Sequence, residues 1–150
     1  MYKQVLTVLL GFVFLMGCSG MTPKLGLNND NLVPCPQSPN CVSSQITDKK
    51  HFIEPLYFIG SQQKTQAQLL RTLKTLQRTN IIDIEDNYIR VEFTSKVFKF
   101  VDDVEFYFPV TESETTIIYF RSASRLGYSD LGANRKRIEQ ISQKLKLYQE

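Results

Sequence analysis

The polar segment from Arg121 to Arg137 carries the side chains that are best suited to bind an anion. Arg121 and Arg125 have planar guanidinium groups, which match the geometry of phosphate and carboxylate. Ser122 and Ser124 lie between them in the sequence and add hydroxyl donors. We therefore expect a small anionic ligand to bind these four residues.

A helix N-terminus extends this candidate site. Ser129-Asp130 is a good capping pair, and Asn134 and Arg135 follow in the first turns of the expected helix. Unpaired backbone N–H groups at a helix N-terminus attract anions, although Asp130 would compete with an anion there. Asp130, Asn134 and Arg135 are therefore further candidate ligand-binding residues. Basic side chains so early in a helix oppose its dipole and need acidic partners or a ligand.

Three carboxylates leave two alternatives open. Asp102, Asp103 and Glu105 alternate along one expected strand, so only Asp103 and Glu105 share a face. Paired carboxylates can do acid–base catalysis, which would make the protein an envelope enzyme that uses them with Arg121 and Arg125. In the structural alternative, Arg121 pairs with Glu105, Arg125 pairs with Asp102 or Asp103, and no ligand binds.

Other classes of activity have little support. The sequence has no G-x-S-x-G motif, and its single histidine, His51, favours a structural role over a catalytic base. We expect no metal, no cofactor and, on balance, no enzymatic activity. The net charge is only +3, and the longest basic run is Arg135-Lys136-Arg137. Nucleic acid is therefore not an expected partner.

The N-terminus predicts export and lipid anchoring. One basic residue, Lys3, precedes an apolar run from Val5 to Met16, which is typical of a signal peptide over residues 1–17. Leu15-Met16-Gly17-Cys18 matches the bacterial lipobox, so we expect Cys18 to carry diacylglycerol and palmitate and to hold the protein on a membrane. Ser19 matches the outer-membrane sorting pattern, which would face the domain toward the periplasm in a Gram-negative cell. An envelope protein is an alternative partner.

The remaining cysteines predict a disulfide. With Cys18 acylated, Cys35 and Cys41 are left in an oxidising compartment. A metal or redox pair is the alternative, but the spacing is unlike CxxC and no histidine lies nearby in sequence. Three prolines around the pair predict an ordered loop there. Residues 18–33 are rich in Gly, Asn and Thr and are expected to form a lipidated tether, with a single domain over residues 34–150.

Periodicity predicts an α+β fold. A helix begins at Ser61 or Thr65 and ends near Asn80, and a second helix follows Ser129-Asp130 and ends near Tyr148. Residues 51–59 are expected to form an edge strand or a packed connection. Four strands are expected at residues 81–85, 88–94, 101–110 and 116–123. We expect a two-layer sandwich with an antiparallel sheet of about four strands and two helices on one face.

Alternation along the strands predicts how they pair. If Phe106 lies opposite Phe120, Glu105 lies opposite Arg121 and Tyr107 opposite Tyr119. Arg90 and Glu92 then lie on the same charged face of the sheet. In the structural alternative, the opposite charges on this face pair with one another and only fix the alignment of neighbouring strands.

Three segments resemble the domain-of-unknown-function family DUF1499. They are CPQSPNCVSS (35–44), VDDVEF (101–106) and RSASRLGYSDLGANRKR (121–137). The likeness spans about residues 34–147. It implies a domain that often occurs as a secreted or lipid-anchored bacterial protein, and it implies no activity. The three segments are polar, so we suspect that they converge on one site.

Overall fold

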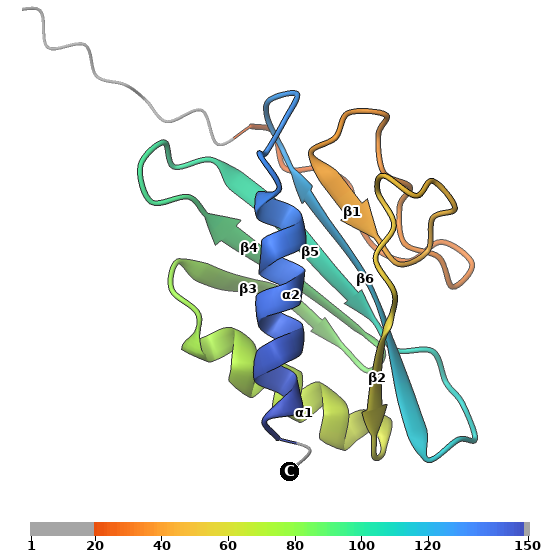
Figure 1. The fold of residues 1–150 in the computed structure, drawn as a ribbon. Coiled ribbons are helices and arrows are strands. Elements are labelled where there is room, and N and C mark those ends of the chain that lie inside the picture. The colour runs from red at the N-terminus through yellow and green to blue at the C-terminus, as the bar shows by residue number, and fades with distance from the viewer. Residues whose placement is uncertain (1–19, 149–150) are drawn as a thin grey trace, which may run out of the picture.

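The longest strand, β6 (Thr115–Ser124), pairs with other strands along both of its edges. On one edge, β2 (Leu56–Ile59) and β1 (Cys41–Ser43) pair with successive parts of it. On the other edge lie β5 (Val101–Tyr107), β4 (Tyr88–Thr94) and β3 (Thr79–Glu85), in that order (Figure 1). This is a computed structural model, and it describes residues 20–148.

The sheet has six antiparallel strands, where the sequence predicted about four. The extra strands are β1, which lies in the expected loop, and β2, which lies within residues 51–59, where an edge strand or a packed connection was expected. β1 has only three residues and β2 four, too few to show alternation clearly, and both owe their extended form to pairing with β6. Pairing between segments so far apart in the chain leaves no local sequence signal, which is why β1 was expected to be part of a loop.

The first helix, α1 (Gln62–Thr75), begins where the sequence predicted and ends earlier. The Ser61 side chain accepts a hydrogen bond from the Lys64 backbone N–H. We expected the helix to continue to Asn80, but Leu76 is already extended and Asn80 pairs with Glu92 in the sheet. The strand pairing of residues 79–81 therefore overrides the helical periodicity.

The second helix, α2 (Ala133–Lys146), packs with α1 on one face of the sheet (Figure 1). Each helix buries one apolar stripe there. These stripes meet buried side chains of the strands, such as Val104, Phe106 and Phe120. Hydrophobic burial of this kind is the main favourable term in folding. The buried helix residues are Leu69, Leu73, Ile138, Ile141 and Leu145.

The predicted register between the central strands is confirmed. Glu105 lies opposite Arg121, Phe106 opposite Phe120, and Tyr107 opposite Tyr119. Arg90 lies opposite Glu105 across the other edge of β5. Because side chains alternate between faces, these charges lie on the face of the sheet that is turned away from the helices.

Residues 20–33 cover much of this charged face. The Gly26 backbone N–H donates to Glu105 Oε1 at 3.1 Å, and Tyr107 donates its hydroxyl to Asp30 Oδ1 at 3.0 Å. Leu32 is buried against Tyr88 and Tyr107. The tether expected over residues 18–33 thus contacts the domain through Gly26, Asp30 and Leu32, and the arrangement is not a plain two-layer sandwich. Cys18 and the expected signal peptide over residues 1–17 lie outside the described residues.

Candidate functional site

The sheet divides the predicted site residues between its two faces. The face away from the helices carries what we call the sheet network, and the face toward α2 carries the helix-side cluster. Arg135 belongs to neither, since it donates to the backbone oxygens of Lys50 and Phe52. The sheet network consists of Arg90, Glu92, Asp103, Glu105, Arg121 and Arg125. The helix-side cluster consists of Asp102, Ser122, Ser124, Asp130, Asn134 and Arg137.

Asp103 is the central acceptor of the sheet network. Arg125 donates to both of its carboxylate oxygens, at 2.7 and 2.8 Å, and Arg90 donates to Oδ1 at 2.8 Å. Arg125 also pairs with Glu92. Of the two partners that the structural alternative offered Arg125, the fold selects Asp103.

Glu105 is the second acceptor, and it is completely buried. Tyr88 donates its hydroxyl to Oε1 at 2.7 Å, and Arg121 donates to Oε2 at 3.3 Å. The Gly26 N–H completes the shell from the covering segment. Every oxygen of this carboxylate therefore has a protein donor.

The environment shifts the pKa of three groups on this face. Burial raises the pKa of Asp103, but the hydrogen bonds from Arg125 and Arg90 outweigh burial and hold that pKa below its ordinary value. Burial, followed by the nearby Glu105 charge, raises the pKa of the Tyr88 hydroxyl far above its usual range. Burial and the hydrogen bond to Asp30 raise the pKa of Tyr107 to about 12.

These contacts decide what the sheet network can do chemically. Asp103 and Glu105 are each bound by arginine and covered, so neither presents an open oxygen to a substrate. The Nε atoms of Arg90 and Arg121 are buried without a protein partner among the described residues. The geometry fits paired charges that hold three strands and residues 20–33 together.

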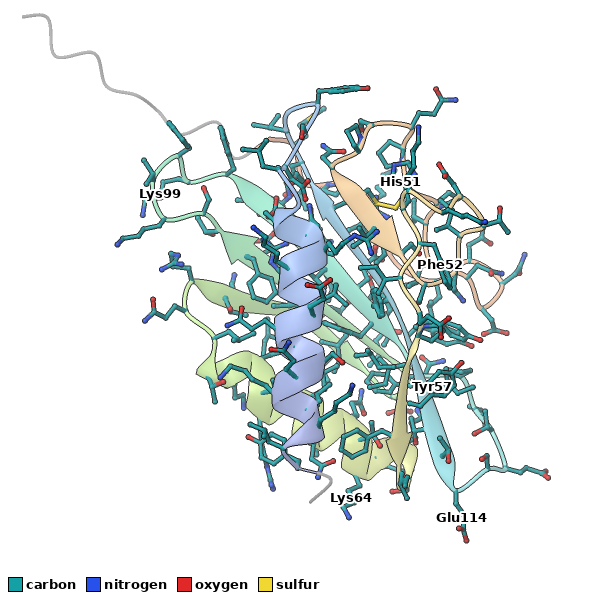
Figure 2. The ribbon with its side chains drawn as sticks, viewed as in Figure 1. His51, Phe52, Tyr57, Lys64, Lys99 and Glu114 are labelled. Atoms are coloured by element: carbon teal, nitrogen blue, oxygen red, sulfur yellow. A yellow bond between two sulfur atoms is a disulfide. The ribbon has the colours of Figure 1, made fainter. Side chains whose placement is uncertain are left out.

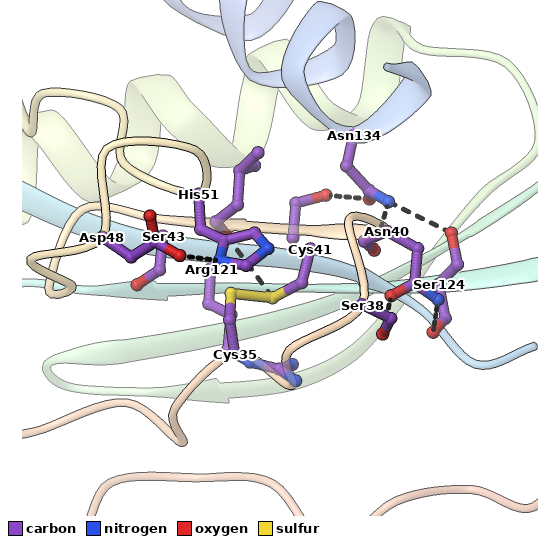
Figure 3. The surroundings of a disulfide bond; sticks show 12 residues. Cys35, Ser38, Asn40, Cys41, Ser43, Asp48, His51, Arg121, Ser124 and Asn134 are labelled. Carbon is purple, nitrogen blue, oxygen red and sulfur yellow. Dashed lines mark hydrogen bonds and ion pairs between the residues drawn. A yellow bond between two sulfur atoms is a disulfide. The ribbon is translucent and has the colours of Figure 1, made fainter. Parts of the chain in front are cut away.

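Asn134 is the centre of the helix-side cluster. It is fully buried, and its amide donates to the Asn40 backbone oxygen at 3.0 Å and to Ser124 Oγ at 3.1 Å (Figure 3). Its Oδ1 accepts hydrogen bonds from Ser122 and Arg137. This one side chain thus joins the start of α2 to β6 and to the loop before β1.

Asp130 and Arg137 complete the cluster. Asp130 accepts from the backbone N–H groups of Gly132 and Asn134, and these bonds hold its pKa below its ordinary value against the opposing effect of burial. Arg137 donates to Asp102 and lies over the ring of Phe93, with 4.8 Å from Cζ to the ring centroid. Asp130 therefore occupies the N–H groups that were expected to attract a ligand.

The disulfide fastens the loop that reaches this cluster. Cys35 and Cys41 are bonded, as the cysteine count predicted (Figure 3). Cys41 begins β1, and the neighbouring Asn40 donates its amide to the Gly127 backbone oxygen at 2.7 Å. His51 is buried, and its Nδ1 lies 3.1 Å from Asp48 Oδ2. The segments 35–44 and 121–137 are therefore in direct contact.

A basic cleft that the sequence did not reveal lies between the end of α1, the end of β4 and one side of α2. Its volume is about 490 Å³, and its lining contains no carboxylate. Lys136, Gln140 and Lys144 recur every four residues and so lie on one side of α2. That four-residue spacing in the sequence indicates a polar side of the helix. Arg78 lines the same cleft because α1 ends early, which the sequence did not predict. The cationic residues that line the basic cleft are Arg78, Lys136, Arg137 and Lys144.

Neither a metal-binding group of side chains nor a membrane-spanning helix is found between residues 20 and 148. That part of the chain holds no group of three or more histidine, cysteine or carboxylate side chains that could bind a metal ion. It also contains no helix that is both long enough and apolar enough to cross a membrane.

Comparisons with known proteins give one family. The chain is similar in structure to TTHA0849 from Thermus thermophilus, with a TM-score of 0.35 and 8% identity over 73% of this chain and 99% of that chain. A likeness of this size carries no argument about function. A search of curated proteins found no significant match. The model of DUF1499, described as a protein of unknown function, matches residues 31–145. The matched range includes both polar clusters and the disulfide, and the chain therefore belongs to the DUF1499 family.

Proposed function

We propose that the protein is a lipid-anchored module of the cell envelope that binds a small anionic ligand in the basic cleft. The observation that carries the binding role is the presence of unpaired cations there. Lys136 and Lys144 line the cleft, and their side chains form no hydrogen bond or ion pair with any residue in the range 20–148. A solvated lysine pair is common on protein surfaces, but here it lines a concave site in which Asp102 neutralises only Arg137.

The position of Lys136 strengthens this argument. It lies in the first turns of α2, where the helix dipole disfavours a positive charge by about 0.3–1 kcal/mol. α2 also has no acidic residue in its first turn, and the carboxylate at its N-terminus, Asp130, accepts backbone N–H groups and does not pair with Lys136. A bound anion would relieve this repulsion, and Arg78 on the facing wall would bind the anion from the other side.

The sheet network and the helix-side cluster then have a structural role in this proposal. Their donors and acceptors bind one another, so the predicted pocket at Arg121, Ser122, Ser124 and Arg125 offers few open groups. A phosphate or carboxylate ligand fits the cleft better, because Lys136 and Lys144 keep all their donors available. The enzymatic alternative has no support from the geometry of Asp103 and Glu105.

The anchor is supported by the lipobox at Cys18 and by the apolar run before it. Acyl chains contribute about 0.8 kcal/mol for each buried methylene, so more than one chain would hold the protein on a membrane durably. Localisation in the envelope, on the outer membrane if the cell is Gram-negative, follows from that anchor.

Titration calorimetry with inorganic pyrophosphate tests the binding role. We expect Lys136→Gln with Lys144→Gln to weaken binding at least tenfold, because two cations are lost at the site. Lys49→Gln with Lys64→Gln is the matched control, since these lysines are exposed, lie away from the cleft and change the net charge equally. Equal losses in both double variants, or no binding by the unaltered protein at millimolar pyrophosphate, would overturn the proposal.

A separate experiment tests the anchor. Cells that express the full chain are grown with labelled palmitate, and label should appear on the unaltered protein but not on Cys18→Ala. Persistent labelling of Cys18→Ala would contradict acylation at this cysteine.

A further inference from the structure

Three segments meet at one end of the domain, which we call the loop end. They are the start of the described chain at residues 20–21, the β4–β5 loop at residues 95–100, and the β6–α2 loop at residues 125–132. Gly20 packs against Arg125 and Leu126, and the Arg125 N–H donates to the Val101 backbone oxygen. Figure 2 shows Lys99 at this end and Lys64 and Glu114 at the opposite one.

The loop end exposes large apolar side chains at the tips of its loops. Phe98 is 69% exposed and stacks on Phe100, with 5.5 Å between ring centroids. Leu131 is 90% exposed at the tip of the other loop. Single exposed apolar residues are normal, but several on adjacent loops mark an interaction surface. The exposed apolar residues of the loop end are Met21, Val97, Phe98, Phe100, Leu126, Tyr128 and Leu131.

The charges of these two loops are positive where they are open to a partner. Lys96 and Lys99 flank Val97 and Phe98, and residues 95–100 contain no carboxylate. Asp130 is the acidic residue of the β6–α2 loop, and its oxygens accept backbone N–H groups of α2. Aromatic and aliphatic side chains between lysines favour the boundary of an anionic bilayer, where lysine ends reach the headgroups.

We propose that the loop end lies on the surface of a lipid bilayer, with Val97, Phe98 and Leu131 inserted at the headgroup boundary. The inference rests on the lipid anchor of the proposed function for its location. Only Ser19 separates Cys18 from Gly20, and two residues of extended chain span at most about 7 Å. Because Gly20 is packed on the domain, an acylated Cys18 would keep the loop end beside the membrane.

The same geometry favours a bilayer over a protein partner. The short connection between Cys18 and Gly20 would hold the bilayer at a very high effective concentration beside the loop end. A protein partner would have to displace the bilayer from that surface. Other exposed apolar residues, such as Ile59 at the far end of β2, lack this connection. A second copy of the chain docked at the loop end is the alternative that the test must exclude.

The test uses tryptophan fluorescence, because the chain contains no tryptophan. Residues 1–18 are replaced by a histidine tag that binds a chelator lipid, so the result does not depend on acylation of Cys18. All the contacts described above lie within residues 20–148, which this chain retains. Phe98→Trp is the reporter, and Ile59→Trp, which is similarly exposed at the opposite end, is the matched control.

With vesicles that contain phosphatidylglycerol, we expect brominated lipids to quench the Phe98→Trp protein at least threefold more than the Ile59→Trp protein. Adding Lys96→Gln and Lys99→Gln should reduce that quenching at least twofold. Equal quenching of both reporters, or none at position 98, would overturn the proposal. A concentration-dependent blue shift at position 98 without vesicles would also overturn it, in favour of a second copy. Absence of palmitate label on the unaltered protein would instead refute only the anchor.

Discussion

Arg125 binds Asp103 through two parallel hydrogen bonds, from Nε to Oδ2 at 2.7 Å and from Nη2 to Oδ1 at 2.8 Å. Both side chains are almost entirely buried, with 6% and 2% exposed. A bidentate pair of this kind is geometrically specific as well as strong. It fixes the chain just beyond the end of β6 to β5 on the face that residues 20–33 cover.

Arg125→Gln should lower the free energy of unfolding by about 3–5 kcal/mol, because it leaves the buried Asp103 carboxylate short of donors. Urea denaturation at neutral pH measures the change. Arg71→Gln is the control, since Arg71 is exposed on α1, and its effect should stay within about 0.5 kcal/mol. Equal stability of the two variants would mean that the sheet network is not structural.

Stability should fall in acid through Asp103. Its pKa in the folded protein lies below the ordinary value of 3.8, so the folded state binds fewer protons than the unfolded state between the two values. Its contribution is therefore complete above the ordinary value and is lost as the pH falls from 3.8 toward the lower, folded pKa. Asp103→Asn should show a smaller loss of stability between about pH 5 and about pH 2 than the unaltered protein.

Denaturation midpoints across this pH range test the expectation. Asp86→Asn, in an exposed turn, is the control and should keep the pH dependence of the unaltered protein. If Asp103→Asn and Asp86→Asn gave the same curve, the acid sensitivity would come from other groups, such as Asp130, whose pKa is also lowered.

The covering segment should contribute to stability through Leu32, which is 5% exposed against Tyr88 and Tyr107. We expect Leu32→Ala to cost about 2–3 kcal/mol, which is the usual effect of such a cavity. Met21→Ala is the matched control in the same segment, because Met21 is exposed and should change stability by less than about 0.5 kcal/mol. Chemical denaturation that found both substitutions silent would show that residues 20–33 are a free tether.

Asn134→Ala should destabilise the protein by about 3 kcal/mol, because buried donors and acceptors of Ser122 and Asn40 lose their partner. Thermal unfolding should show a clear fall in Tm. Asn80→Ala, at an exposed position of β3, is the control and should leave Tm nearly unchanged. A small effect at both positions would mean that water replaces the Asn134 amide.

Local pattern was enough for much of the fold. Strict alternation from Tyr88 to Thr94 predicted both ends of β4 correctly. Placing Phe106 opposite Phe120 on the apolar face then predicted that Glu105 lies opposite Arg121. This works because a sheet with one buried face strongly disfavours a slip of one residue. The cysteine count likewise predicted the bond between Cys35 and Cys41.

Tertiary contacts decided the rest. Asp102 and Asp103 are neighbours in sequence, yet alternation sends one to Arg137 below α2 and the other to Arg125 on the opposite face. The covering role of residues 20–33 depends on Glu105 and Tyr107, which lie far along the chain and give the segment no periodicity of its own. The sequence therefore determined which side chains are charged or apolar and which face of a strand each occupies. Only the packing of distant segments decided which charges neutralise one another and which lysines remain open in the basic cleft.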